Sequence, residues 1–505
     1  MALLLALLLA GPSDLADKLR HLNSVAAAWA PTPSRDVSRV AFLTTLFGTC
    51  QAASMAAEGG YPLQLTDEPG GVLAIRFVPA DSSQLIALAI RGGRHRILLV
   101  DEAGAPEAEI DPAPGDQFIG GFARDGKRLF YAVVDAGHVV LKTVPLDTKK
   151  PAVVAPPPPA AGVQPLAGSL PLQEALAGLF ALGPPSSDGR SLLALVQRGQ
   201  GEALVQIDLT AARGELLTDV PAHFRQPRYS PDGRTVYVLT DAGRSTLGVD
   251  AITVKGKERK TVYAPPQDLQ AFAVTEDGHR LAVAAEATGE TLFSLLELPS
   301  LRAQPLAAPP SGALAEVQPG EAPLAWDRTG ERLFFGWRLA DDTTDVWELR
   351  LGYGTPMRLT RSPRPGLPRD AIVRPAPLKI GGLQAWLWRP AQPPKPRVAV
   401  LVSSAETRPV FDKRIAALNF GGLAVLAVNG KGAQAAALSY LRGAEDLDGR
   451  APLLLDFDGL AVDDPAKWSG VVMPPGRNKA GLELDPEQPE LEALVKYARR
   501  GGGAL

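Results

Sequence analysis

The sequence predicts a seven-bladed β-propeller followed by a smaller α/β domain, and three observations support this fold class. A turn mark centred on Asp-Gly recurs at a nearly constant spacing through the first two thirds of the chain. Two apolar positions follow each mark in the same phase. The period stops at a proline-rich segment, after which strands and helices alternate. A period near 45 residues is typical of four-stranded blades, and strand–helix alternation is typical of a mainly parallel sheet.

The clearest copy of the mark is Tyr229–Leu239, with the sequence YSPDGRTVYVL. Pro231 presets the entry to a tight turn, and Gly233 can adopt the positive φ that such a turn needs. Apolar residues then alternate, as in a strand that buries one face. The reference residues of the seven copies are Asp36, Asp81, Asp125, Asp188, Asp232, Asp277 and Thr329.

The spacings between successive marks are 45, 44, 63, 44, 45 and 52 residues. The two long spacings contain insertions rich in proline and alanine, Pro151–Gly168 and Ala303–Pro323. Because proline has no N–H to donate to a strand ladder, we expect Pro151–Gly168 to be exposed and to lie outside the blades. A single blade cannot bury both of its faces, so seven marks predict seven blades stacked in a ring.

Each mark is followed four and six residues later by an apolar residue, which predicts the buried face of the second strand of a blade. The first positions are Val40, Leu85, Leu129, Leu192, Val236, Leu281 and Leu333. The second positions are Phe42, Ala87, Tyr131, Ala194, Val238, Val283 and Phe335. Large apolar anchors precede four marks by three residues, at Phe122, Tyr229, Val274 and Trp326.

The composition changes after Arg361, and this change sets the expected domain boundaries. We expect the propeller at residues 31–361, a proline-rich boundary at 362–369 and the α/β domain at 370–505. The strands expected in that domain are Leu383–Trp388, Val398–Val402, Leu423–Val428, Leu453–Phe457 and Val471–Met473. The expected helices are Phe411–Asn419, Ala433–Leu441 and Pro486–Arg500.

Residues 1–30 begin with the short apolar run Leu3–Ala10, followed by a helical pattern. The run is too short to cross a bilayer as a helix, so no transmembrane segment is expected. It resembles the apolar region of a secretory signal, although no basic residue precedes it. We therefore expect a periplasmic or secreted protein, with a cytoplasmic one as the alternative. If the run is not a signal, it leads into a helix that Ser13 caps. This helix would pack through one apolar face, formed by Leu15, Leu19, Leu22 and Val25.

The composition, 46% apolar and 21% charged, is that of an ordinary folded protein. The net charge of −3 gives no reason to expect a nucleic-acid partner. Cys50 is the single cysteine, which excludes an intrachain disulfide and a cysteine-based metal site. We expect Cys50 to be a buried small apolar side chain of the first blade and not a nucleophile. No cofactor is expected.

A propeller with such turns followed by an α/β domain resembles the prolyl oligopeptidase family of serine peptidases. The phrases that carry the resemblance are Arg39–Thr45 and Tyr61–Thr66 in the first blade, Gly354–Thr360 in the last, and Gly382–Pro390 at the junction. Periplasmic TolB-like binding propellers share the propeller phrases. The resemblance implies a seven-bladed propeller joined to an α/β-hydrolase domain, and the shorter domain here implies a truncated version of it.

The residues that the family uses for catalysis are replaced in this sequence. The strand that should end in a His-Gly-Gly oxyanion turn ends at Ser403-Ser404, and Asp458 stands where the nucleophilic serine belongs. No Gly-x-Ser-x-Gly elbow occurs in the sequence. The five histidines all precede Arg280, at His21, His95, His138, His223 and His279. The α/β domain therefore has no histidine to serve as the base of a Ser-His-Asp triad.

Other candidate sites in the α/β domain are weaker. An acidic cluster could bind a divalent cation, or could be a solvated loop after the strands; its members are Asp456, Asp458, Asp463 and Asp464. Gly430–Gly432 lacks the full phosphate-loop pattern and is expected to be a turn. Two functions remain open. One is an inactive relative that binds a peptide or protein partner through the propeller or the interdomain pocket, and the other is a hydrolase with an atypical site.

Overall fold

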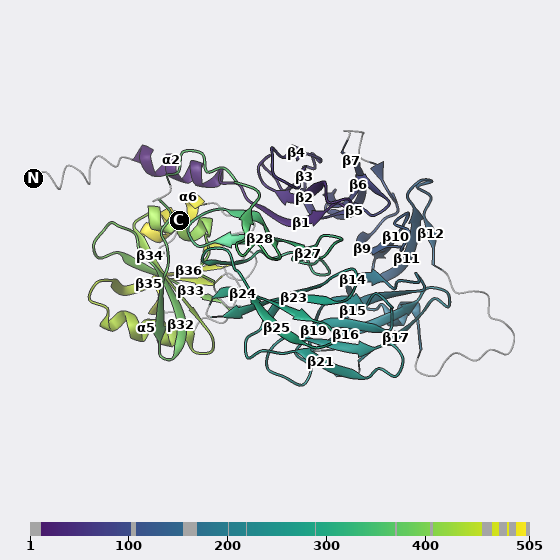
Figure 1. Cartoon of the computed structure of the whole chain (residues 1–505). Helices are drawn as coiled ribbons and strands as arrows, with labels where there is room; N and C mark the ends of the chain where they lie inside the picture. Colours follow the sequence, from purple (N-terminus) through teal and green to yellow (C-terminus); the bar gives the residue numbers. More distant parts are fainter. Residues whose placement is uncertain are drawn as a thin grey trace, which may run out of the picture.

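The computed structural model describes residues 12–102, 108–154, 169–199, 201–218, 220–287, 289–368, 371–403, 408–456, 467–473, 482–483 and 491–500. The described residues form seven antiparallel propeller sheets and one mixed sheet. Figure 1 shows the propeller sheets arranged as a ring, with the α/β domain beside it. The seven-bladed propeller followed by an α/β domain is the fold that the periodicity predicts.

The first three blades follow the chain, and each begins with its innermost strand. Blade 1 is β1 (Ala28–Pro33), β2 (Arg39–Thr44), β3 (Gln51–Ala56) and β4 (Leu63–Gln64). Blade 2 is β5 (Val72–Val78), β6 (Asp81–Arg91), β7 (Arg94–Asp101) and β8 (Ala108–Glu109). Blade 3 is β9 (Asp116–Phe122), β10 (Arg128–Asp135), β11 (His138–Pro145) and β12 (Ala152–Val153).

The next three blades have the same order, and blade 4 carries an extra outer strand and a short helix. Blade 4 is β13 (Leu170–Pro171), α3 (Leu172–Ala175), β14 (Leu179–Pro185), β15 (Ser191–Arg198), β16 (Gly201–Asp208) and β17 (Arg213–Leu216). Blade 5 is β18 (Phe224–Tyr229), β19 (Thr235–Thr240), β20 (Gly248–Thr253) and β21 (Arg259–Tyr263). Blade 6 is β22 (Leu269–Val274), β23 (Arg280–Ala287), β24 (Glu290–Glu297) and β25 (Arg302–Leu306).

Blade 7 differs because its innermost strand is interrupted. Its strands are β26 (Gly312–Leu314), β27 (Leu324–Trp326), β28 (Arg332–Leu339), β29 (Thr344–Arg350) and β30 (Met357–Arg358). Both β26 and β27 pair with β28, where Leu314 is opposite Trp337 and Leu324 is opposite Phe335. Residues 315–323 therefore leave the blade between two nearly adjacent ladder positions.

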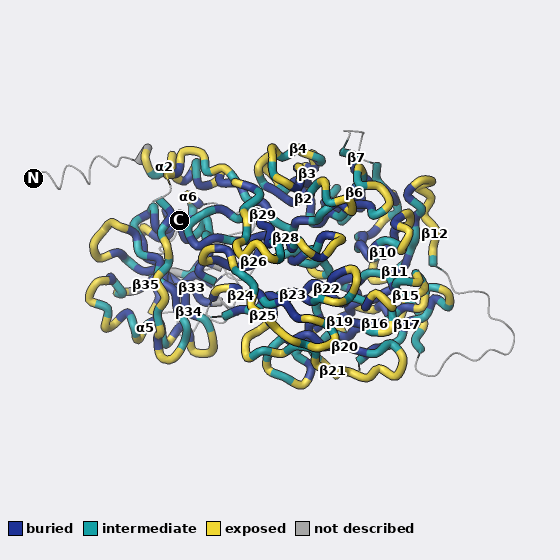
Figure 2. Tube along the Cα trace, viewed as in Figure 1, coloured by how far each residue is buried: buried dark blue, intermediate teal, exposed yellow. Residues whose placement is uncertain are grey.

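The apolar positions that follow the marks form the core between the blades (Figure 2). All fourteen of these side chains are at most 1% exposed. The anchors that precede the marks end inner strands, as Tyr229 ends β18 and Trp326 ends β27. Blade faces thus pack on each other through the residues that the period identifies.

Serine or threonine pairs with the aspartate in several of the turns. Ser34 Oγ donates to Asp36 at 2.6 Å and accepts from the Arg39 amide at 3.0 Å. The same pairs join Ser186 to Asp188, Ser230 to Asp232 and Thr275 to Asp277. In the first turn Val37 adopts a φ of +58° where other copies have glycine. The hydroxyl-to-carboxylate bond therefore supports the turn even where the glycine is missing.

The start of Pro151–Gly168 is exposed as predicted, but the prediction that it lies outside the blades is wrong. Ala152 and Val153 form β12, which pairs with Thr143 and Lys142 as the outermost strand of blade 3. An edge strand tolerates the neighbouring Pro151 because only one of its sides pairs. Residues 155–168 lie outside the described residues.

The α/β domain has one sheet with the strand order β31-β32-β34-β33-β35-β36-β37. Its strands are β31 (Ala376–Ile380), β32 (Leu383–Trp388), β33 (Arg397–Ser403), β34 (Leu423–Asn429), β35 (Asp448–Asp456), β36 (Gly470–Met473) and β37 (Leu482–Glu483). The strands from β33 onward pair in parallel, whereas β31 and β32 pair antiparallel. The sequence analysis did not identify β31 or β37.

Helices cover both faces of this sheet. They are α4 (Lys413–Phe420), α5 (Ala433–Gly443) and α6 (Leu491–Arg500). The predicted C-terminal helix is confirmed over Leu491–Arg500, and residues 484–490 lie outside the described residues. Leu418 and Leu494 pack on one face of the sheet, and Ala437 and Leu441 pack on the other.

The N-terminal helix α2 (Pro12–Asn23) packs on the α/β domain and not on the propeller that follows it (Figure 1). Leu19, Leu22 and Val25 are buried against Ala417 of α4 and Val495 of α6. The expected helix is therefore confirmed in the described residues, but it begins at Pro12, so Ser13 lies in its first turn and is not its cap. Residues 1–11 lie outside the described residues. No helix in the described part of the chain is long and apolar enough to cross a membrane.

Side chains close the ring between blades 1 and 7, since neither blade contributes a strand to the other. Phe42 and Met55 of blade 1 pack on Phe334 and Val346 of blade 7. Beside this apolar contact, Glu58 of blade 1 pairs with two arginines of blade 7. Its carboxylate oxygens lie 3.0 Å from Arg332 Nη1 and 2.7 Å from Arg350 Nη2, and both arginines also bind the fully buried Glu348.

We predict that Ser34→Ala lowers the free energy of unfolding by about 1 kcal/mol at pH 7, because the turn loses its buried hydroxyl. The Ser34 hydroxyl and the Ser38 amide lower the pKa of Asp36 to about 2. A lowered pKa stabilises the fold above the ordinary pKa near 4 and loses this effect as the pH falls toward 2. Urea unfolding at several pH values should show the difference from wild type shrinking over that range. Ser245→Ala, at an exposed serine, is the control.

We predict that Arg332→Met lowers the free energy of unfolding by about 2 kcal/mol, because Glu348 keeps only Arg350 as its partner in a buried position. The Arg332 side chain is 13% exposed, so water compensates little. Arg302→Met, in the exposed outer strand of blade 6, is the matched control and should change stability by less than about 0.5 kcal/mol. Equal stability of the two variants in urea unfolding would contradict the role of the seam network.

Candidate functional site

The carboxyl edge of the α/β sheet is where the family's catalytic residues would lie, and three sequence positions meet there. The ladder places Ser403 opposite Asn429 and Val402 opposite Asp456. The ends of β33, β34 and β35 are therefore side by side, as expected for the ligand-binding edge of a parallel sheet. Ser404, Asp458, Asp463 and Asp464 lie outside the described residues.

Asp456 does not belong to a solvated loop, which corrects that part of the expectation for the acidic cluster. Its side chain is fully buried, because β35 continues to residue 456 between β33 and β36. Within the described residues, no group of three His, Cys, Asp or Glu side chains is placed to hold a metal ion. Gly430–Gly432 forms the turn between β34 and α5, where Gly430 and Gly432 have positive φ.

The described contacts between the two domains come mainly from blades 6 and 7. Arg408 Nε lies 3.2 Å from the Glu286 carboxylate, and the Phe411 amide donates to the Leu339 carbonyl at 2.8 Å. Arg374 pairs with Asp341 at 2.6 Å. These propeller residues belong to the connections at the end of the blades opposite the Asp-Gly turns. A hollow of about 350 Å³ lies between the domains, with Glu290, Ser311, Arg374, Gln384 and Trp386 in its lining.

The histidines are not among these described interdomain contacts. His279 follows the Asp277-Gly278 turn, so it lies at the opposite end of blade 6. His223 of blade 5 is exposed, and its Nδ1 lies 2.7 Å from Asp241 Oδ2. The imidazole of His95 in blade 2 contacts the ring of Phe118 in blade 3. His138 is the first residue of β11 in blade 3. His21 lies in α2 beside Gly366. The structure therefore does not bring a described histidine to the carboxyl edge.

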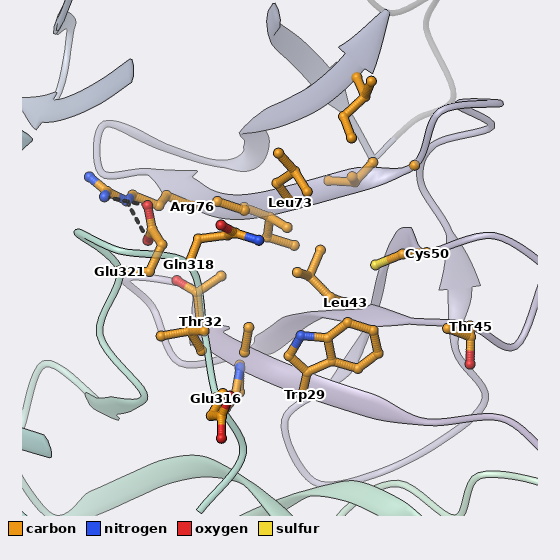
Figure 3. Close-up of a pocket in the computed structure, with 18 of the residues that line it drawn as sticks. Trp29, Thr32, Leu43, Thr45, Cys50, Leu73, Arg76, Glu316, Gln318 and Glu321 are labelled. Atoms are coloured by element: carbon orange, nitrogen blue, oxygen red, sulfur yellow. Dashed lines mark hydrogen bonds and ion pairs between the residues drawn. The ribbon is translucent and has the colours of Figure 1, made fainter. Parts of the chain in front are cut away.

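The main cavity lies in the funnel of the propeller and has a volume of about 840 Å³. Its apolar wall comes from blades 1 and 2 and includes Trp29, Leu43, Val72, Leu73 and Ile75. Figure 3 shows Thr45 at one end of the cavity and the pair of Arg76 and Glu321 at the other, with Trp29, Leu43 and Leu73 between them. A cavity of this size whose wall combines apolar side chains with polar and charged groups has the character of a ligand site.

The wide end of this cavity opens on the side of the propeller that bears the α/β domain. Thr45 and Gly48 line it there, in the β2–β3 connection, which is equivalent to the connections that contact the α/β domain. The deep end is lined by Arg76, Arg228 and Ala322. Arg228 and Ala322 also line a second hollow of about 500 Å³ that extends to the Asp-Gly turns. The deep end is therefore the passage between the two hollows.

Residues 315–323, which interrupt the inner strand of blade 7, cross this funnel. The Glu321 amide donates to the Gln318 carbonyl at 3.0 Å, which closes a turn through Pro319 and Gly320. Gly320 has a φ of +89°, and a Cβ added there would lie 3.1 Å from the Cβ of Ala181 in blade 4. Only glycine combines this backbone conformation with so close an approach.

Glu321 then pairs with Arg76 of blade 2. Its carboxylate lies 2.6 Å from Nη2 and 3.1 Å from Nε of Arg76, in a two-pronged ion pair. Arg76 Nη1 donates to the Gly120 carbonyl of blade 3 at 3.3 Å. Both side chains of the pair are 18% exposed. One segment of blade 7 is thus held by residues of blades 2, 3 and 4.

Cys50 also lines the cavity and is half-buried, so the prediction of a fully buried residue is wrong. It lies in the β2–β3 connection, at the edge of the apolar cluster between blades 1 and 2. Burial raises the pKa of its thiol to about 12. The thiol is therefore protonated at neutral pH, which is consistent with the expectation that Cys50 is not a nucleophile.

Arg76, Arg228 and Glu321 were not predicted from the sequence as site residues. Arg228 is visible in the sequence directly before Tyr229, as a charged residue near the end of an inner strand. Inner strands line the funnel, so a charged residue on the funnel-facing side of such a strand could have been predicted as a site residue. Ala303–Pro323 was identified as an insertion, but its position inside the funnel depends on the pairing of β26 and β27 with one strand.

The solved structures similar to this chain include peptidases and a hydrolase. A prolyl endopeptidase, from a study of inter-domain dynamics in catalysis and specificity, matches with a TM-score of 0.70 and 13% identity over 98% of this chain and 80% of that one. Puromycin hydrolase matches with a TM-score of 0.68 and 13% identity over 90% of this chain and 78% of that one. A puromycin-hydrolyzing peptidase of Mycobacterium tuberculosis matches with a TM-score of 0.68 and 14% identity, with the same coverage.

No protein-family profile matches the sequence, and no curated protein matches it. At 13–14% identity the structural likeness establishes the fold and leaves the activity open. The fold confirms the predicted likeness to prolyl oligopeptidases, with a propeller joined to a hydrolase-like domain.

Proposed function

We propose that this protein binds a peptide in the funnel of its propeller and has no serine-peptidase activity. The observation that carries the proposal is the cavity of about 840 Å³, which has an apolar wall and a charged deep end. Backbone and side chains of a short peptide need both kinds of surface, since apolar side chains lose contact with water while charged groups keep partners. The wide end opens toward the α/β domain, so that domain borders the route of entry.

The lack of peptidase activity is inferred from the residues of the α/β domain. A serine hydroxyl is a weak nucleophile unless a neighbouring base accepts its proton. The sequence has no histidine after His279, and Asp458 occupies the nucleophile position. At the described carboxyl edge the strand ends bring together Ser403, Asn429 and Asp456, which do not form a triad.

We predict that a fluorophosphonate probe does not label the purified protein. The probe reacts with serines that an adjacent base activates, and the α/β domain has no histidine to do so. Mass spectrometry after incubation with the probe measures the result, with the denatured protein as the background control. Stoichiometric labelling of a serine in residues 370–505, lost when that serine is changed to alanine, would show instead that the protein is a hydrolase with an atypical site.

We predict that Leu73→Trp weakens binding of the tetrapeptide Ala-Pro-Leu-Phe at least tenfold. Leu73 is half-buried in the cavity wall, so a larger side chain there fills the cavity. Isothermal titration calorimetry measures the affinity, and Leu292→Trp, on an exposed part of blade 6, is the matched control. Gln384→Trp fills the interdomain hollow in the same way. Loss of binding in Gln384→Trp but not in Leu73→Trp would place the peptide between the domains.

A further inference from the structure

The deep end of the funnel contains two arginines and one carboxylate. Arg76 has a carboxylate partner, because Glu321 accepts from it with both oxygens, and the Gly120 carbonyl accepts a third bond. Arg228 lies at the same passage, on the inner strand of blade 5. Glu321 balances one of the two positive charges there. Glu316, the other carboxylate of the cavity lining, lies beside Trp29 and away from Arg76 (Figure 3), 4.0 Å from Arg408 Nη1. Of the charges at the passage itself, one positive charge is therefore in excess.

Arg228 is the arginine without a carboxylate partner. The described residues place no carboxylate within ion-pair distance of it, and its one described side-chain hydrogen bond is a long one, 3.4 Å, to the Pro227 carbonyl. Burial lowers the pKa of Arg228 to about 10, with repulsion from Arg76 adding to the effect and Glu321 opposing it. Arg228 is half-buried. A guanidinium partly removed from water with most of its donors free is costly unless an anion binds it.

The cavity wall between the wide end and the passage determines which other groups the ligand must have. Trp29, Leu43 and Leu73 line the cavity between its wide end and Arg76 (Figure 3). A ligand that enters from the wide end therefore meets an apolar surface first and a guanidinium last. The planar donor fork of arginine matches the two oxygens of a carboxylate.

We propose that Arg228 binds the C-terminal carboxylate of a peptide whose apolar side chains lie against Trp29, Leu43 and Leu73. This inference rests on the proposed function, and it names the end of the peptide and the group that recognises it. A terminal carboxylate suits the position because Arg228 lies at the deep end of the cavity, beyond the apolar wall. Glu321 provides specificity: it neutralises Arg76, so one free guanidinium remains for one carboxylate.

The test compares Ala-Pro-Leu-Phe with its C-terminal amide by isothermal titration calorimetry. The free acid should bind 10- to 100-fold more tightly than the amide, since a charge-assisted pair in a desolvated site is lost with the charge. Arg228→Met should weaken the free acid by the same factor and leave the amide unchanged. Arg228→Lys, which keeps the charge but loses the planar fork, should restore part of the affinity. Arg302→Met removes an exposed arginine and should change neither.

The melting temperatures of the variants show whether they are folded, and they test whether Arg228 lacks a structural partner. Arg228→Met should not lower the melting temperature, because it removes a charge that has no partner. Arg76→Met should lower it, because it leaves Glu321 unpaired in the funnel. Equal losses of melting temperature in the two variants would show that Arg228 is a structural residue and would overturn the inference.

The outcomes separate the inference from the proposed function. Equal binding of the free acid and the amide would overturn the role of Arg228 while the peptide function stands. A third probe, 3-phenylpropionate, carries one ring and one carboxylate without a peptide. If 3-phenylpropionate binds through Arg228 and neither peptide form binds, the carboxylate site stands and the peptide function fails. Failure of all three probes would overturn both. An Ala-Glu-Leu-Phe amide that binds as well as the free acid would assign the site to an acidic side chain, against the C-terminus.

Discussion

Every blade of the propeller has two apolar faces, and each face can be covered only by the next blade in the ring. The structure depends on this requirement at one place above all, the seam between blades 1 and 7. Each of these blades is built from consecutive strands, so no main-chain ladder crosses the seam. The apolar contact around Phe42 and Phe334 and the ion pairs from Glu58 to Arg332 and Arg350 hold it closed. Closure of the propeller ring therefore depends on these side-chain contacts.

The same ring creates the axial space that becomes the candidate site. Blade 7 fills part of this space by breaking its inner strand and sending residues 315–323 across to blades 2 and 4. The crossing segment turns an open channel into a cavity with a wide mouth and a passage at its deep end. It also fixes the charge of the passage, since Glu321 engages Arg76 and leaves Arg228 free of a carboxylate. The architecture and the chemistry of the funnel therefore have one origin.

Much of the fold was predictable because the Asp-Gly marks and the apolar positions record local geometry. The residues four and six positions after each mark, such as Val236 and Val238, are apolar in every copy. All of them are buried. The helices and central strands of the α/β domain were found within a few residues for the same reason. β12 was missed because two residues at a proline-rich edge leave almost no pattern, and its pairing is visible only in three dimensions.

The candidate site was less predictable than the fold. Sequence comparison directs attention to the carboxyl edge at Ser403 and Asp458, because the resemblance concerns catalysis. Arg76, Arg228 and Glu321 come from three blades, and Arg76 and Glu321 are far apart in the chain. Only closure of the ring brings them together. No local pattern marks a residue whose importance depends on the blade across the funnel.

The packing of α2 has a consequence for the order in which the protein is made. Helix α2 is synthesised before the propeller, yet it packs on α4 and α6, which are synthesised after the propeller. The apolar face of α2 around Leu19 and Leu22 must therefore stay uncovered while the whole propeller is translated. Domains generally fold as they emerge, and exposed apolar helices are what chaperones bind. The apolar face of α2 thus stays exposed during translation until α4 and α6 have been synthesised and the α/β domain has folded.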